Sequence, residues 1–387
     1  MTNPPRSRSA PFPIDRRTEG PTAINASPQT LISKVDGAAG RLRLNRPKAI
    51  HALDLDMVLA MTASLIEWLH EPKVEAVIID HAPAPDGDPK LSRGFCAGGD
   101  VVTIAKSAKG TGAAARAFFF NEYRLNHLLF TYPKPTVVFM DGVTMGGGVG
   151  ISRPCRYRIA TDRTLFAMPE TSIGLFPDVG GGWHLSRLLG RLPQFLALTG
   201  ARLDGAECFA LGLATHYVAH EDVDQLKADI ARDPDRIDAW LAHAQAAPPP
   251  ARIKSNRDKI CRLFEPETLE GILKALEADG SEWALKELET LRRKSPMACK
   301  VSLRLLEKSA GMRDFAGEMT MEYALMAHVS AHPDFAEGVR ALLVDKDNNP
   351  RWQPASPEEV TEEMVEAMFD PLPPQDSWTP LPLTRYQ

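Results

Sequence analysis

The chain has 387 residues, which at roughly 150 residues per domain allows about two domains, or one large domain with an appendage. A net charge of −5 and a pI near 6.1 count against a general nucleic-acid binder, because such proteins are usually basic. No apolar run approaches the roughly 18–20 residues that a membrane-spanning helix needs. We therefore expect a globular protein that binds neither nucleic acid nor membranes.

The cysteines and residues 1–30 bear on the compartment. The five cysteines form no CxxC pair, so the sequence indicates neither a disulfide framework nor a zinc site and favours a reducing compartment. Residues 1–30 are rich in proline, lack an apolar period and are expected to form a flexible tail. Their arginines are typical of an organelle transit peptide, but Asp15 and Glu19 count against one. We predict the cytoplasm, with the mitochondrial matrix as the alternative.

From Leu31 onward, segments with strand character alternate with segments of helical period. We expect strands at 41–44, 74–80, 136–140, 157–160, 164–167 and 215–218. We expect helices at 53–68, 113–130 and 204–213, the first with Asp54 near its start. Alternation of this kind is typical of an α/β fold in which helices cover the sheets.

The second half of the chain reads mainly as helices. Helical periods dominate after Asp222, and the run Ala246–Pro250 marks a linker. The predicted organisation is a core at 31–230, a helical region at 231–370 and a loose proline-rich tail at 371–387. Basic residues of the helical region are expected to be mostly solvated.

Two glycine-rich segments are candidates for a binding site: Gly94–Asp100 and Met140–Ile151. Glycines let a backbone approach a ligand closely, and a helix N-terminus presents unpaired N–H groups. Two such groups directed at one point form an oxyanion hole, in which one donor contributes about 2.7–4 kcal/mol. The alternative is two tight turns without chemistry. Neither segment matches the dinucleotide-binding or phosphate-binding loop patterns.

Two acids follow in apolar, glycine- and proline-rich surroundings, Glu170 and Asp178. Carboxylates in such surroundings tend to have a raised pKa, which suits acid–base catalysis. The alternative, equally favoured by the residues alone, is a pair of surface acids that cap helices. On the same basis Glu122 is interpreted as an exposed helical acid. The histidines His51, His127 and His184 lack metal-like spacing and are interpreted as structural or surface residues, and no metal is predicted.

Taken together, the motifs resemble the crotonase, or enoyl-CoA hydratase/isomerase, superfamily. The matching segments are NRPKAIHAL (45–53), GFCAGGD (94–100), DGVTMGGGVG (141–150) and MPETSIGLFPDVGGG (168–182). The segment DFAEGVRALLVDKDNNPRWQPA (334–355), with TMEY at 320–323, points to the 3-hydroxyisobutyryl-CoA hydrolase branch. The resemblance implies a crotonase-like spiral of ββα units and a helical C-terminal region that covers the active site. It also implies self-contact, and hence a possible homo-oligomer.

The resemblance implies an acyl-CoA substrate and no separate cofactor. The N–H groups matching an oxyanion hole are those of Gly99 and Gly147, and Gly147 also matches a substrate contact. The matching acids are Glu122, which binds substrate, and the catalytic Glu170 and Asp178. Further substrate-binding positions are Ala97, Gly98, Arg46 and Lys48, with Arg340 and Lys346 as candidates near the nucleotide.

The implied reaction is hydrolysis of a short 3-hydroxyacyl-CoA, foremost 3-hydroxyisobutyryl-CoA in valine breakdown. Glu170 either activates water or attacks the carbonyl, and Asp178 orients the substrate hydroxyl or serves a second half-reaction. Hydratases of the superfamily use two glutamates, and the first falls at Gly150 here. Gly150 counts against an enoyl-CoA hydratase or isomerase, which is kept as the alternative function. A non-catalytic scaffold or RNA-binding relative is disfavoured by the net charge and by the intact site motifs.

Overall fold

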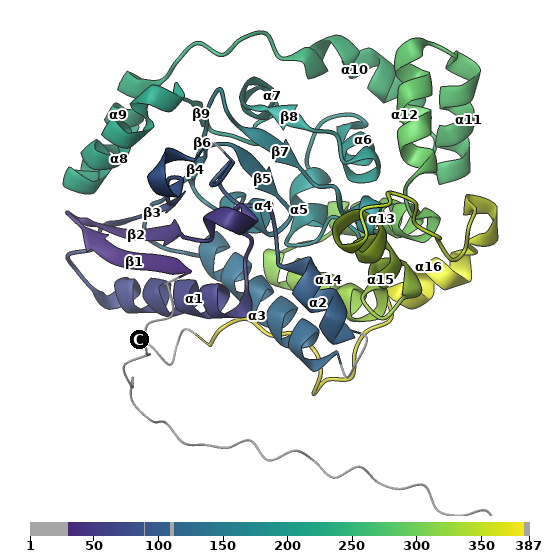
Figure 1. Cartoon of the computed structure of the whole chain (residues 1–387), viewed down its shortest axis with the longest axis horizontal. Coiled ribbons are helices and arrows are strands. Elements are labelled where there is room, and N and C mark those ends of the chain that lie inside the picture. The colour runs from purple at the N-terminus through teal and green to yellow at the C-terminus, as the bar shows by residue number, and fades with distance from the viewer. Residues whose placement is uncertain (1–29, 89, 109–111, 383–387) are drawn as a thin grey trace, which may run out of the picture.

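The computed structural model describes residues 30–88, 90–108 and 112–382. Most of the predicted N-terminal tail and the last five residues of the predicted C-terminal tail lie outside the described residues. The described part is built from two sheets and many helices (Figure 1). The predicted α/β class is confirmed.

The larger sheet has six strands in the order β1-β2-β3-β4-β6-β9. Its strands are β1 (Leu31–Asp36), β2 (Ala39–Leu44), β3 (Ala76–His81), β4 (Thr136–Met140), β6 (Tyr157–Ala160) and β9 (His216–Tyr217). β1 and β2 form an antiparallel hairpin, and every later neighbour is parallel. Since both faces of a parallel sheet are covered, β4 is buried along its whole length.

The smaller sheet holds three strands in the order β5-β7-β8. They are β5 (Val143–Met145), β7 (Leu165–Ala167) and β8 (Leu203–Asp204). The chain passes from β4 to β5 and then into α4 (Gly147–Ser152), and from β6 to β7 and then into η3 (Glu170–Ile173) and α5 (Gly181–Leu185). Each turn thus adds one strand to each sheet before a helix, which is the predicted repetition of ββα units.

Helices cover both faces of the larger sheet. On one face lie α1 (Leu55–His70) and α3 (Ala113–Phe130), and on the other lie α8 (Val223–Arg232) and α9 (Ile237–Ala244). Side chains of β3 alternate between the two layers: Val77 and Ile79 belong to the first core, Ala76 and Ile78 to the second. α1 begins two residues after the start predicted at 53, because the Asp54 carboxylate caps it by accepting a hydrogen bond from Met57 N.

The remaining helices connect and enclose the core. They are α2 (Val101–Ala108), α6 (Leu192–Thr199), α7 (Gly205–Ala210), α10 (Arg252–Leu263), α11 (Leu269–Asp279), α12 (Glu282–Arg292), α13 (Pro296–Ala310), α14 (Phe315–Val329), α15 (Pro333–Val339) and α16 (Glu362–Met368). The linker predicted around 246–250 is observed as the extended connection between α9 and α10 (Figure 1). α13 packs against α5 and α6, α14 against α3, and α15 against η3 and α2.

The C-terminal segment differs from the loose tail predicted for 371–387. As far as residue 382 it runs back along α3 (Figure 1). Trp378 is only 2% exposed and donates a hydrogen bond to the carbonyl of Phe120. Arg124 on α3 donates to the carbonyl of Thr379. A proline-rich composition predicts little local structure, and it does not show that one buried tryptophan fixes the segment by tertiary contact.

None of the described helices is both long and apolar enough to cross a membrane.

Candidate active site

The two glycine segments, 94–100 and 140–151, lie side by side because β5 pairs with the chain at Cys96. Cys96 N donates to the carbonyl of Val143 across 2.8 Å. The contact continues into α4, where a methyl group in place of the Gly148 hydrogen would lie 2.5 Å from the Cys96 carbonyl oxygen. Glycine is therefore required at 148 by the close approach of two backbones.

This pairing brings the N–H groups of Gly99 and Gly147 together. Gly147 is the first residue of α4, so its N–H has no partner inside the helix. A methyl group built on Gly147 would lie 3.2 Å from Gly99 N, and one built on Gly98 would lie 3.6 Å from Gly147 N. Within the described residues, neither Gly99 nor Gly147 donates its N–H to a protein acceptor. Both donors are therefore available to one ligand oxygen.

Three acids from three elements converge beside these glycines. Glu122 on α3, Glu170 at the start of η3 and Asp178 before α5 are 2%, 5% and 6% exposed. A methyl group on Gly147 would lie 2.5 Å from Glu122 Oε1, and one on Gly146 would lie 3.3 Å from Glu170 Oε1. The interpretation of these residues as exposed surface acids is therefore wrong.

Burial dominates the electrostatics of the three acids. It raises the pKa of Glu122 and of Glu170 well above the usual range, and the neighbouring Asp178 charge raises both further. Burial also raises the pKa of Asp178 to about 7. The phenol of Tyr123 acts in the opposite direction, because its O–H donates to Asp178 Oδ2 across 3.0 Å. A carboxyl that titrates near neutral pH is suited to proton transfer.

Several buried polar atoms at this place lack a partner within the part of the chain that the structure describes. They are Glu122 Oε1, Glu170 Oε2 and both amide atoms of Asn126. Buried polar atoms are nearly always hydrogen-bonded in folded proteins, so a cluster of exceptions needs an explanation. Glu122 and Asn126 lie one turn apart on α3, and both face the glycines of α4. The arrangement is typical of a site that completes its hydrogen bonds with ligand or water.

Position 150, where a two-glutamate hydratase site would carry its first acid, has no space for a side chain. A methyl group built on Gly150 would lie 2.6 Å from Val179 Cβ and 3.0 Å from Asn126 Nδ2. Val179 and Asn126 are both buried. A carboxylate at 150 would therefore have to displace the chain next to Asp178.

Four residues of this site went unrecognised in the sequence: Tyr123, Asn126, Lys294 and Glu322. Lys294, expected on a solvated basic face, is half-buried; its ammonium donates to Ser172 Oγ across 2.5 Å, and its charge lowers the pKa of nearby Glu170. Glu322 accepts hydrogen bonds from the turn after Asp178. Only Glu322 lies within a quoted motif, TMEY, whereas the others lack a local signal.

The loop predicted to contact coenzyme A has two different cations. The Arg46 guanidinium donates to the carbonyl of Ala52 (2.6 Å) and to the carboxylate of Asp100 (3.0 Å), so it holds the loop itself. Lys48 is exposed, as is Ala97, whose N–H donates to the carbonyl of Ile50 in the same loop. The loop thus borders the glycine segment 94–100 and presents Lys48 to solvent.

The other predicted residues lie in ordinary structural settings. Arg340, a nucleotide candidate, pairs with Glu337, Asp345 and Asp347, and Lys346 is exposed. The ring of His51 accepts from Arg46 N and bonds Ser92 Oγ, and burial lowers its pKa to about 3. His51 is therefore neutral and structural, as predicted. Among the described residues no group of three His, Cys, Asp or Glu is arranged to hold a metal.

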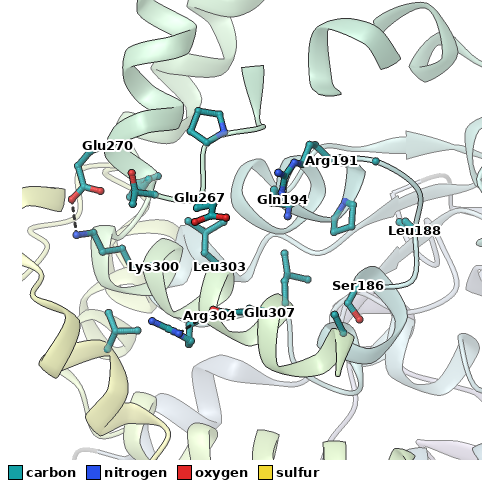
Figure 2. A pocket seen from close by; sticks show the side chains of 18 of the residues that line it. Ser186, Leu188, Arg191, Gln194, Glu267, Glu270, Lys300, Leu303, Arg304 and Glu307 are labelled. Atoms are coloured by element: carbon teal, nitrogen blue, oxygen red, sulfur yellow. Dashed lines mark hydrogen bonds and ion pairs between the residues drawn. The ribbon is translucent and has the colours of Figure 1, made fainter. Parts of the chain in front are cut away.

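A cavity of about 430 Å³ lies elsewhere, between the core and the C-terminal helices (Figure 2). None of the three acids lines it. Its Lys300 is paired with Glu270 across 2.6 Å, as the dashed line in Figure 2 shows, and Arg304 is paired with Glu307. Its charges are therefore largely balanced within the protein.

The arrangement as a whole has two parts with complementary chemistry. Two adjacent N–H groups can receive an oxygen on which negative charge develops. Three buried carboxyls beside them can exchange protons or attack an electrophilic carbon. These parts suit reactions of a polarised carbonyl, namely acyl transfer to water, hydration of a conjugated double bond, or enolate chemistry.

Residues 39–369 match the family described as enoyl-CoA hydratase/isomerase. The chain is 42% identical over 349 residues to a protein of Xenopus laevis named 3-hydroxyisobutyryl-CoA hydrolase, mitochondrial, and the match covers 88% of each. It is 39% identical over 361 residues to the human protein of that name, covering 91% of each. A solved structure described as a carnitinyl-CoA dehydratase from Mycobacterium thermoresistibile superposes with a TM-score of 0.85 at 40% identity, covering 91% of this chain and 98% of that one.

Proposed function

Because the chain belongs to the enoyl-CoA hydratase/isomerase family, we propose that it hydrolyses 3-hydroxyisobutyryl-CoA to 3-hydroxyisobutyrate and free coenzyme A. Similarity to relatives named for this hydrolysis extends over almost their whole length. The observation that carries the proposal is the acid set: Glu170 and Asp178 are buried together, while position 150 has no space for a second hydratase glutamate. The reaction is a step of valine breakdown.

In the proposed mechanism the thioester oxygen binds between the N–H groups of Gly99 and Gly147. Negative charge grows on that oxygen as the carbonyl carbon becomes tetrahedral, and two fixed donors stabilise it. Loss of one such donor typically costs about 2.7–4 kcal/mol of transition-state stabilisation. The unpartnered state of both N–H groups in the described chain supports this assignment.

Glu170 supplies either the base or the nucleophile. As a base it takes a proton from water, whose oxygen attacks the carbonyl carbon; the C–S bond breaks and the thiolate takes up a proton. As a nucleophile its carboxylate displaces the thiolate, and water then hydrolyses the resulting anhydride. After a single turnover in ¹⁸O-water, label in Glu170 identifies the covalent route, because only hydrolysis of the anhydride at its protein carbonyl leaves ¹⁸O in Glu170 itself.

In this proposal Asp178 transfers protons and Glu122 binds the substrate hydroxyl group. Asp178 titrates near neutral pH because it is buried, so it can accept a proton from water or return one to the thiolate. Glu122 has an oxygen without a partner in the described chain, close to Gly147. A 3-hydroxyl group would give that oxygen the hydrogen bond it lacks.

The second candidate is hydration or dehydration of an acyl-CoA, and the described dehydratase at 40% identity favours it. Against it stands the crowding at Gly150 by Val179 and Asn126. Crotonyl-CoA separates the two candidates, because a hydratase consumes its conjugated double bond without releasing thiol.

The test of the proposed function measures free thiol released from 3-hydroxyisobutyryl-CoA by the full chain. We expect steady release, and a loss of at least about 100-fold in Glu170→Gln, since general acid–base catalysis contributes about 10²–10⁴. Glu207→Gln is the matched control, because Glu207 is also a buried glutamate, but its carboxylate accepts from the N–H groups of Asp204 and Ile253, outside the site. Absence of thiol release from the wild type, or equal rates in wild type and Glu170→Gln, would contradict the proposal.

Three further points are part of the proposal. Acyl-CoA is the partner expected from the family, and coenzyme A is part of the substrate rather than a separate cofactor. The related hydrolases are named mitochondrial, whereas residues 1–29 of this chain lie outside the described residues, so the cytoplasmic assignment stays a prediction. The same holds for a homo-oligomer.

A further inference from the structure

The turn that follows Asp178 has no cap of its own. It leads into α5, a helix of five residues whose N-cap is Gly180, with φ +83° and no side chain to accept a hydrogen bond. A helix start that is buried without a capping acceptor leaves N–H groups unpaired, which is costly. The structure supplies the acceptor from elsewhere in the chain.

The acceptor is Glu322 on α14, 142 residues after the turn. Its Oε2 accepts from Gly180 N across 2.7 Å, and its Oε1 accepts from Gly182 N across 3.2 Å. Glu322 is 0% exposed. Burying a carboxyl costs free energy unless the group is hydrogen-bonded. Because both oxygens of Glu322 are bonded to one turn, Glu322 holds that turn in a single geometry.

The same helix also supports Asp178 through the phenol of Tyr123. Tyr123, whose O–H donates to Asp178, packs edge-to-face against Tyr323, with ring centroids 6.3 Å apart. Glu322 and Tyr323 are neighbours on α14, so one helix contacts both the backbone turn and the phenol that hold the Asp178 carboxylate.

We infer that Glu322 is a positioning residue for Asp178, through which the C-terminal helix α14 sets the geometry of the active site. The inference rests on the proposed function for its kinetic consequence, whereas its structural consequence is independent of substrate. Glu207 on α7 is the matched comparison. It is also buried, and its two oxygens also accept from backbone N–H groups, those of Asp204 and Ile253, which lie outside the site.

The charged and titratable groups around Asp178 and Glu322 come from three elements. Glu122 and Tyr123 face Asp178 from α3, Glu170 from η3, and Glu322 from α14, where Glu318 is its nearest acid. Burial and Glu318 raise the pKa of Glu322. Because several acids surround Asp178, the test uses readouts that do not depend on assigning one titration.

The experiment compares Glu322→Gln with Glu207→Gln in the full chain. A glutamine has one acceptor oxygen, and its NH₂ cannot accept from the second N–H, so the clamp is broken. We expect faster amide exchange, by hydrogen–deuterium mass spectrometry, in a peptide spanning residues 176–186 of Glu322→Gln only. For thiol release we expect kcat to fall about 100-fold with KM changed less than threefold, because misplacement by about 1 Å costs about 10².

Equal exchange and equal kcat in the two variants would overturn the inference. If the wild type releases no thiol, the proposed function has failed, and the exchange comparison alone then decides the inference. Should Glu322→Gln not fold, Glu322→Asp replaces it, because the shorter carboxylate keeps its charge and reaches only one of the two N–H groups. Wild-type exchange and kcat in Glu322→Asp would also overturn the inference.

Discussion

Replacing Asp178 by asparagine tests whether the buried Asp178 carboxyl lowers the free energy of unfolding. The pKa of this carboxyl is raised from 3.8 to about 7 in the folded protein by burial. Between these two values the folded state binds more protons than the unfolded state, so the stability falls as the pH rises. Above pH 7 the shift lowers the free energy of unfolding by about 4 kcal/mol in full. Asparagine keeps an oxygen that can accept from Tyr123 and does not titrate.

The assay is urea unfolding of wild type and Asp178→Asn at pH 4 and at pH 8. We expect nearly equal free energies of unfolding at pH 4 and a variant more stable by up to about 4 kcal/mol at pH 8. Asp224→Asn is the control, because the side chain of Asp224 is 92% exposed. A difference between wild type and Asp178→Asn that does not grow with pH, or that favours the wild type at pH 8, would refute the reasoning.

Three further predictions concern the site and the tail. Gly147→Ala should lower kcat for thiol release at least about 100-fold, because its methyl group would lie 2.5 Å from Glu122 Oε1; wild-type turnover would count against the proposed oxyanion hole. Tyr123→Phe removes a hydrogen bond that lowers the pKa of Asp178, so the limb of the pH–rate profile that follows Asp178 should move to higher pH; an unmoved or lowered limb would contradict this. Trp378→Ala should destabilise the fold by about 3–5 kcal/mol in urea unfolding; a loss below about 1 kcal/mol would mean that the tail is not anchored.

Much of the core could be predicted because its signals are local. The helix predicted at 113–130 is observed with the same bounds, since its apolar period and the prolines after it are visible in the sequence. The strand at 136–140 also agrees, because a short β-branched apolar run reads as a buried strand. The strand predicted at 74–80 begins two residues later and ends one later, a difference typical of element ends.

The site could be predicted only in the part that its motifs encode. The glycines and Glu170 lie in segments whose composition is unusual, so they attract attention without a structure. Tyr123 and Glu322 lie 55 and 142 residues from the chain positions that they hold, and the local sequence gives neither of them a role in the site, although Glu322 lies within the TMEY motif. Glu122 illustrates the limit most clearly, because its sequence neighbours predict an exposed helical acid, whereas tertiary packing buries it.

The central claim is that the chain hydrolyses the thioester, so that an oxygen of water enters the acid product, and ¹⁸O-water tests it most directly. Wild-type protein would be incubated with 3-hydroxyisobutyryl-CoA in ¹⁸O-water under multiple turnovers, and the products analysed by mass spectrometry. The account predicts free coenzyme A and 3-hydroxyisobutyrate with one ¹⁸O in its carboxylate. Label in the hydroxyl group of an intact thioester, without free coenzyme A, would contradict it and assign the chain to hydration chemistry.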